Sequence, residues 1–118
     1  DMRTDPALYQ PTNGIDPTLP PSRMDDVMDV YVADTEPTHP SVSPLFGSMD
    51  SLPPTIITTG TRDQLLAGCL RLERKMRRSG VEVDCRVWDG MWHVFEFYDD
   101  YPESKESLLE IAAFLNRH

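Results

Sequence analysis

The chain has 118 residues, which is the size of one domain and excludes an assembly of several domains. Eleven Lys and Arg residues against 20 Asp and Glu residues give a formal net charge of −9, which argues against nucleic acid or an anionic membrane as the main partner. The sequence has no apolar run of about 18 residues and no basic-then-apolar leader, so it predicts neither a membrane span nor a signal peptide. Two cysteines, Cys69 and Cys85, are too few for a disulfide scaffold, and we expect a reducing, cytoplasmic setting.

The first half of the chain is rich in proline. Because each proline fixes φ and removes a hydrogen-bond donor, long helices and central strands are excluded over 1–22 and 34–54. Between these stretches the sequence predicts a helix over 22–31, with Ser22 and Asp25 as a capping box. Its apolar stripe would consist of Met24, Val27, Met28 and Tyr31. The rest of this half is expected to form an ordered irregular loop, with a disordered tail as the alternative.

The second half begins with a strand and a helix. Residues 55–59 are β-branched throughout and end at Gly60, which is typical of a short buried strand. An amphipathic helix is then expected to open at Asp63 and to close at Gly80, with basic residues in its last turns. Its buried face would consist of Leu65, Leu66, Cys69, Leu72 and Met76.

A second strand and helix follow. Residues 81–88 alternate between apolar and polar, which predicts a half-exposed strand with Val81, Val83, Cys85 and Val87 on its inner face. A loop over 89–101 leads into a helix over 102–116, where Pro102 suits the first turn. The buried face of this helix would consist of Leu108, Ile111, Ala112 and Leu115.

The order strand, helix, strand, helix predicts an α/β fold with two parallel strands. A sheet of two parallel strands is marginal in water, and the sequence offers no further convincing strand. We therefore expect these elements to be the last two strands and helices of a larger α/β sheet. The start at Asp1 instead of a methionine is what we expect of a chain whose upstream part is missing.

Two side chains follow the predicted strands at the points where open α/β sheets place ligands and catalysis. Asp63 comes after the first strand and His93 after the second. Neighbouring parallel strands would bring the two loops together, and a carboxylate beside an imidazole is the acid–base half of a nucleophilic triad. The residues alone leave two alternatives open, because Asp63 also suits a helix N-cap and His93 a structural histidine.

Four blocks of sequence then carry a resemblance to a known family. They are Ser43-Pro44-Leu45-Phe46, Leu52-Pro53-Pro54-Thr55, Gly60-Thr61-Arg62-Asp63-Gln64-Leu65-Leu66 and Gly90-Met91-Trp92-His93-Val94-Phe95. In order and spacing they resemble the C-terminal part of the hormone-sensitive-lipase-like esterases and lipases of the α/β-hydrolase fold. The resemblance implies that Asp63 is the triad acid and His93 the triad base, and that residues 1–34 help to wall an acyl pocket.

The resemblance also implies a domain organisation and a function. Residues 1–118 would be the C-terminal portion of one α/β-hydrolase domain, with 1–54 as pocket wall and connector and 55–118 as the β-α-β-α core. The implied reaction is carboxylic-ester hydrolysis by a Ser-His-Asp triad, with a small acyl ester as substrate and no cofactor. The Gly-x-Ser-x-Gly elbow and the glycine-rich oxyanion loop are absent from these residues, so both are expected in the upstream part of the domain. Ala67 and Gly68 stand where a second acid is common in the family.

Other features have two interpretations. Trp92, Val94 and Phe95 flank the histidine and are expected to contact substrate, although aromatic packing beneath the loop is an equal alternative. The basic stripe of Arg71, Arg74, Lys75 and Arg78 is expected to be a solvated helix face. No second histidine stands at ligand spacing from His93, so we expect no metal. A non-catalytic α/β binding module or an inactive fragment is the alternative function, and a homo-oligomer stays open.

Overall fold

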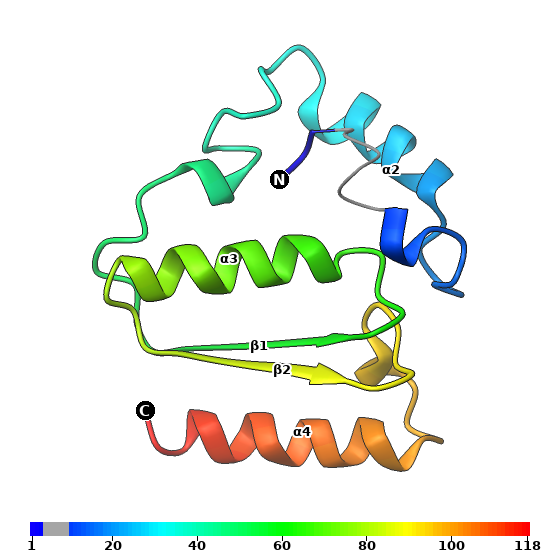
Figure 1. Cartoon of the computed structure of the whole chain (residues 1–118), viewed down its shortest axis with the longest axis vertical. Coiled ribbons are helices and arrows are strands. Elements are labelled where there is room, and N and C mark those ends of the chain that lie inside the picture. The colour runs from blue at the N-terminus through cyan, green and yellow to red at the C-terminus, as the bar shows by residue number, and fades with distance from the viewer. Residues whose placement is uncertain (4–9) are drawn as a thin grey trace.

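The structure is a computed structural model that describes residues 1–3 and 10–118. Strands β1 (Thr55–Gly60) and β2 (Val83–Trp88) pair in parallel, with Thr55 opposite Val83 and Gly60 opposite Trp88. Helix α3 (Leu66–Arg78) connects the strands on one face of this sheet, and α4 (Pro102–Leu115) covers the other (Figure 1). The predicted order of elements and the parallel pairing are confirmed. Because the register ends both strands at the same level, the loops that follow them begin side by side.

The N-terminal half lies on the outer side of α3 (Figure 1). Its described residues form two 3₁₀ turns, η1 (Gln10–Thr12) and η3 (Pro44–Phe46), and the helix α2 (Pro21–Val27), which continues into a π-helical turn η2 (Met28–Val32). Most of its other described residues have irregular backbone, as expected for so many prolines. Residues 4–9 of the predicted loop lie outside the described residues.

Helix α2 confirms the predicted helix but corrects two details. The N-cap residue is Pro20 and no side chain caps the helix, so the predicted capping box of Ser22 and Asp25 is wrong; Pro21 supplies the pre-formed first turn instead. Tyr31 is 57% exposed, whereas Val32 is 2% exposed. The π-turn explains this shift, because its wider i→i+5 spacing moves the inward-facing position one residue along the chain.

The first strand forms over the predicted residues, but the central helix does not open at Asp63: its N-cap residue is Leu65 and no side chain caps it, so the interpretation of Asp63 as the N-cap is wrong. Helix α3 begins at Leu66, three residues after Asp63, and ends at a glycine turn. Gly80 has φ +79°, its N–H donates to the carbonyl of Arg77 at 3.1 Å, and the N–H of Val81 donates to the carbonyl of Met76 at 3.0 Å. This is a Schellman motif, in which glycine has no steric penalty. The chain leads from this turn into β2. The hydrophobic core cluster consists of Met49, Met76, Val81 and Val83.

Two predicted buried faces are wrong in part. In β2, Val87 is 44% exposed. In α4, Leu108 and Leu115 are 47% and 64% exposed, and Ala112 is also exposed. The residues of α4 that the structure buries are Ser104, Ser107 and Phe114.

Hydrogen bonds explain why serines replace leucines on the inner face of α4. The hydroxyl of Ser104 donates to the carbonyl of Phe95 at 2.8 Å, and that of Ser107 donates to the Glu96 carboxylate at 2.9 Å. Both acceptors belong to the 3₁₀ turn η4 (Phe95–Phe97). Buried hydroxyls are stable when they are partnered in this way, so α4 is oriented by the loop that follows β2.

The two loops are in direct backbone contact. A Cβ atom at Gly60 would lie only 2.1 Å from the carbonyl oxygen of Met91, so no larger residue fits there without moving the backbone. The N–H of Arg62 donates to that same carbonyl at 2.9 Å. Thr61 completes the contact, because its hydroxyl accepts the N–H of Gly90 at 2.8 Å. Glycine at position 60 therefore sets the distance between the loops.

We expect Gly60→Ala to lower the free energy of unfolding by about 1–3 kcal/mol, because the added methyl group collides with backbone and not with a flexible side chain. Gly68→Ala is the matched control, since a Cβ atom there meets nothing within 4 Å. It lies inside α3, where alanine should stabilise the helix by about 0.5–1 kcal/mol. Urea unfolding of the protein that carries these residues measures both changes. Equal stability of the wild type and Gly60→Ala would contradict the close approach.

Candidate active site

The carboxylate of Asp63 is fixed at the end of β1. Its side chain is 4% exposed, and its Oδ2 accepts a hydrogen bond from the hydroxyl of Thr59 at 2.7 Å. Its Oδ1 accepts the N–H of Leu65 at 2.8 Å, just before α3 begins. One bond comes from the end of strand β1 and the other from the residue directly before α3, so together they fix the orientation of the carboxylate. Thr59 was not singled out in the sequence, where it is one threonine among several in a strand.

His93 faces this carboxylate from the loop after β2. Its Nδ1 lies 3.3 Å from Oδ1 of Asp63, and the ring is 31% exposed. The hydrogen bond to Asp63 raises the pKa of His93 against the opposing effect of burial, and the negative charges of Asp63, Asp16 and Glu96 add to the rise. Among the described residues, Nε2 of His93 has no hydrogen-bond partner. With Nδ1 protonated toward the acid, Nε2 is free to accept a proton.

The loop turns sharply directly after the histidine. Val94 has φ +49°, in the left-handed region that β-branched residues rarely adopt. This turn sends neighbouring side chains in opposite directions. Phe95 is 1% exposed and packs against Trp88 with ring centroids 5.8 Å apart, while the His93 ring stays at the surface of a cavity.

A second buried carboxylate, which sequence reasoning missed, joins the two loops. Asp16 is 7% exposed, and its Oδ2 accepts the N–H of Gln64 at 2.9 Å and the N–H of His93 at 3.2 Å. Burial opposes ionisation of this group, but the backbone N–H groups of Gln64, Thr18 and Leu19 outweigh it and hold the pKa of Asp16 below its ordinary value. The Asp16-Pro17-Thr18 stretch reads as a local turn, and nothing in it signals contacts so far along the chain.

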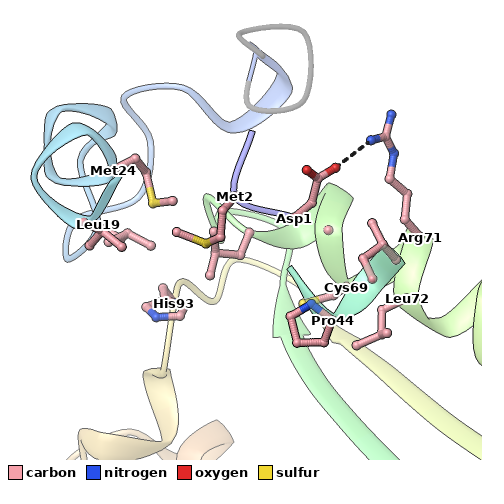
Figure 2. A pocket seen from close by; sticks show the side chains of 13 residues that line it. Asp1, Met2, Leu19, Met24, Pro44, Cys69, Arg71, Leu72 and His93 are labelled. Atoms are coloured by element: carbon pink, nitrogen blue, oxygen red, sulfur yellow. Dashed lines mark hydrogen bonds and ion pairs between the residues drawn. The ribbon is translucent and has the colours of Figure 1, made fainter. Parts of the chain in front are cut away.

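A cavity of about 440 Å³ lies beside His93 (Figure 2). Its walls come from the N-terminal half and from α3, and they are mainly apolar. The apolar lining residues of the N-terminal half include Leu19, Met24, Val27 and Leu45. Those of α3 and of the turn before it are Leu65, Cys69 and Leu72. The structure thus places part of the segment 1–34 beside His93.

The three predicted substrate contacts do not line this cavity. Trp92 is half-buried and meets Tyr98 and Tyr101 edge to face, with centroids 5.6 and 5.3 Å away. Val94 is 55% exposed, and Phe95 lies in the interior. Aromatic packing beneath the loop therefore accounts for Trp92 and Phe95, and substrate contact by these residues stays a prediction.

Four further points concern the chain outside the contact between Asp63 and His93. Lys75 of the basic stripe donates to the carbonyls of Leu45 and Gly47, so it holds η3 against α3 and is more than a solvated charge. Both cysteines are free thiols. Across residues 1–3 and 10–118, no group of three or more His, Cys, Asp or Glu side chains could hold a metal ion. Nor does any helix in the described part of the chain have the length and apolarity to cross a membrane.

Comparison with known proteins gives consistent matches. The sequence profile of the alpha/beta hydrolase fold matches residues 1–97. An esterase of Acinetobacter venetianus is 38% identical over 82 residues, which cover 69% of this chain and 27% of that protein. An acetyl-hydrolase of Streptomyces hygroscopicus is 34% identical over 86 residues, which cover 72% of this chain and 29% of that protein.

Solved structures agree. Esterase E25 superposes with a TM-score of 0.88 at 33% identity, over 100% of this chain and 37% of that one. An esterase from the bacterial hormone-sensitive lipase family superposes with a TM-score of 0.92 at 29% identity, over 99% and 40%. The chain thus spans well under half the length of each of these relatives.

The raised pKa of His93 predicts a pH-dependent stability. A histidine whose folded pKa exceeds its unfolded value of about 6.5 stabilises the fold fully below that pH, and the contribution disappears as pH rises through the folded pKa. Asp63→Asn removes the main cause of the rise. We therefore expect this variant to lose more free energy of unfolding at about pH 6 than at about pH 8.5.

Urea unfolding at both pH values measures this difference. Asp26→Asn is the control, because it makes the same change of charge at an exposed position of α2. An equal loss for Asp63→Asn at both pH values would show that Asp63 does not control the ionisation of His93.

Proposed function

The chain belongs to the alpha/beta hydrolase family, and from that membership we propose that it supplies the acid and the base of a serine esterase. One observation carries the proposal: Nδ1 of His93 lies 3.3 Å from Oδ1 of Asp63 beside an apolar cavity. A carboxylate and an imidazole in this relation form two of the three members of a Ser-His-Asp triad. The esterases and acetyl-hydrolase that resemble the chain support the same reaction class.

The proposed reaction proceeds through an acyl-enzyme. Nε2 of His93 takes the proton of the serine hydroxyl as its oxygen attacks the ester carbonyl carbon, and the imidazolium then gives that proton to the leaving alcohol. Water attacks the acyl-enzyme by the same proton route, releasing the carboxylic acid and restoring the serine. Asp63 keeps Nδ1 protonated and stabilises the imidazolium that forms twice in each cycle. This mechanism needs no cofactor.

The nucleophile and the oxyanion hole are proposed to lie in the rest of the hydrolase domain. The 118 residues contain no Gly-x-Ser-x-Gly motif, and α/β-hydrolases run in the order nucleophile, acid, histidine. That order puts the missing serine upstream of Asp63. In this proposal 1–118 is the C-terminal portion of one domain, with 1–54 as pocket wall and connector and 55–118 as core.

The proposed substrate is an ester with a small to medium acyl chain. A cavity of about 440 Å³ has room for such a chain, and side chains such as Leu19, Met24 and Leu72 offer it apolar contact. The polar ester group would then lie toward His93. The alternative is a non-catalytic module that keeps the frame without the chemistry; a nucleophile elbow in the complete protein distinguishes the two.

We expect His93→Ala to lower kcat/KM on a short-chain p-nitrophenyl ester by about 10³-fold or more in the complete protein, because no other group accepts the serine proton. The ring is 31% exposed, so the thermal midpoint should change little. His39→Ala is the control, since that imidazole lies in an exposed loop. Unfolding of His93→Ala with unchanged turnover per folded molecule would identify a structural histidine instead.

Asp63→Asn separates a local structural role from a catalytic one. The amide oxygen of asparagine can still accept the N–H of Leu65, so a purely local role predicts a nearly silent change. The triad predicts a large loss of kcat, because the equivalent change in a serine protease costs about 10⁴-fold through the wrong tautomer. Steady-state turnover and the thermal midpoint are measured together. Wild-type turnover would show that the triad assignment is wrong.

A further inference from the structure

We propose that Asp16 is a positioning residue of the triad, which holds the acid loop and the base loop at one separation through their backbone N–H groups. The proposal rests on the proposed function of Asp63 and His93. Asp16 does not itself line the cavity or touch the reacting atoms, and it acts through those two residues.

One oxygen atom of Asp16 accepts a hydrogen bond from each of the two loops. Oδ2 of Asp16 accepts the N–H of Gln64, the residue directly after the acid, and the N–H of His93, the base itself. The two nitrogens are therefore kept within two hydrogen-bond lengths of each other. Backbone donors do not depend on side-chain rotamers, so the restraint acts on the paths of the loops.

The carboxylate of Asp16 is itself held by hydrogen bonds from the residues that follow it in the chain. Its Oδ1 accepts the N–H groups of Thr18 at 2.9 Å and Leu19 at 3.0 Å, and the hydroxyl of Thr18 lies 3.0 Å away. That hydroxyl also lies 3.2 Å from the carbonyl oxygen of His93. His93 is thus held on both sides of its backbone, by Asp16 at its N–H and by Thr18 at its carbonyl.

The segment that follows Asp16 forms part of the cavity wall. Leu19 lies three residues after Asp16, and α2 follows with Met24 and Val27; all three line the cavity beside His93 (Figure 2). One buried carboxylate therefore fixes the apolar wall, the base and the acid relative to one another.

The negative charge of Asp16 has an effect on His93 that a residue acting only through packing would not have. Three carboxylates act on the His93 ring: Asp63 from the loop after β1, Asp16 from the N-terminal half and Glu96 from η4. The neighbouring Arg62 guanidinium donates to the carbonyl of Ile15 at 3.0 Å. Loss of the Asp16 charge should lower the pKa of His93. Because the neutral imidazole is the base, the acid limb of kcat/KM against pH should then move to lower pH.

Asp16→Asn in the complete hydrolase tests the proposal. The amide oxygen can still accept the N–H groups of Thr18 and Leu19, but the new NH₂ group faces the two N–H donors of Gln64 and His93. We expect kcat/KM on a short-chain p-nitrophenyl ester to fall by about 10- to 100-fold as the loops shift. The acid limb should move to lower pH. Asp26→Asn, with the same charge change on α2, should alter neither.

Thr18→Val keeps the Asp16 charge and removes the hydroxyl contacts. It should lower kcat/KM by about two- to tenfold and leave the acid limb in place. If Asp16→Asn fails to fold, a Thr18→Val protein with wild-type kcat/KM overturns the proposal. A folded Asp16→Asn protein with wild-type kcat/KM, or with an unmoved acid limb, overturns it too.

His93→Ala and Asp63→Asn in the same assay distinguish a failure of the proposed function from a failure of the positioning role of Asp16. If both keep wild-type turnover, the proposed function itself is wrong. If both are inactive while Asp16→Asn behaves as wild type, the triad stands and only the positioning role of Asp16 is lost.

Discussion

The parallel pairing of β1 with β2 is the constraint on which the rest of the structure depends. Its register ends the two strands at Gly60 and Trp88, so the loops that carry Asp63 and His93 leave the sheet from adjacent points. The absent side chain at Gly60 then lets the backbone at Met91 approach until the loops share hydrogen bonds. The contact between Asp63 and His93 forms between these two loops.

The sequence allowed prediction of those features that depend on near neighbours. β-Branched residues before Gly60 predicted β1, and the glycine at position 80 predicted the end of α3, because both act within a turn of the chain. The meeting of Asp63 and His93 was also predictable, since parallel strands bring their carboxyl ends together. The role of Asp16 was not, because its bonds reach 48 and 77 residues along the chain.

Helix α4 illustrates the same limit in packing. Hydrophobicity favoured an inner face with Leu108 and Leu115, but the inner face is set by the acceptors that the η4 turn presents to Ser104 and Ser107. A polar residue is buried when its partner is already in place, and sequence periodicity holds no information about the partner. At Asp63 the sequence also suited a helix N-cap, but α3 begins after Leu65, and the carboxylate accepts the N–H of Leu65 and faces His93 instead.

The hydrogen bond between Thr59 and Asp63 links the site to the sheet. Thr59 pairs with Val87 across the sheet, so separation of β1 from β2 would release the residue that orients the carboxylate. Sheet strands open with a larger free energy than loops or chain ends do. Heat inactivation of such a site should therefore coincide with melting of the sheet and not precede it, and hydrogen-exchange protection of the Thr61 amide, whose N–H donates to the carbonyl of Trp88 at 2.9 Å, should report the integrity of both.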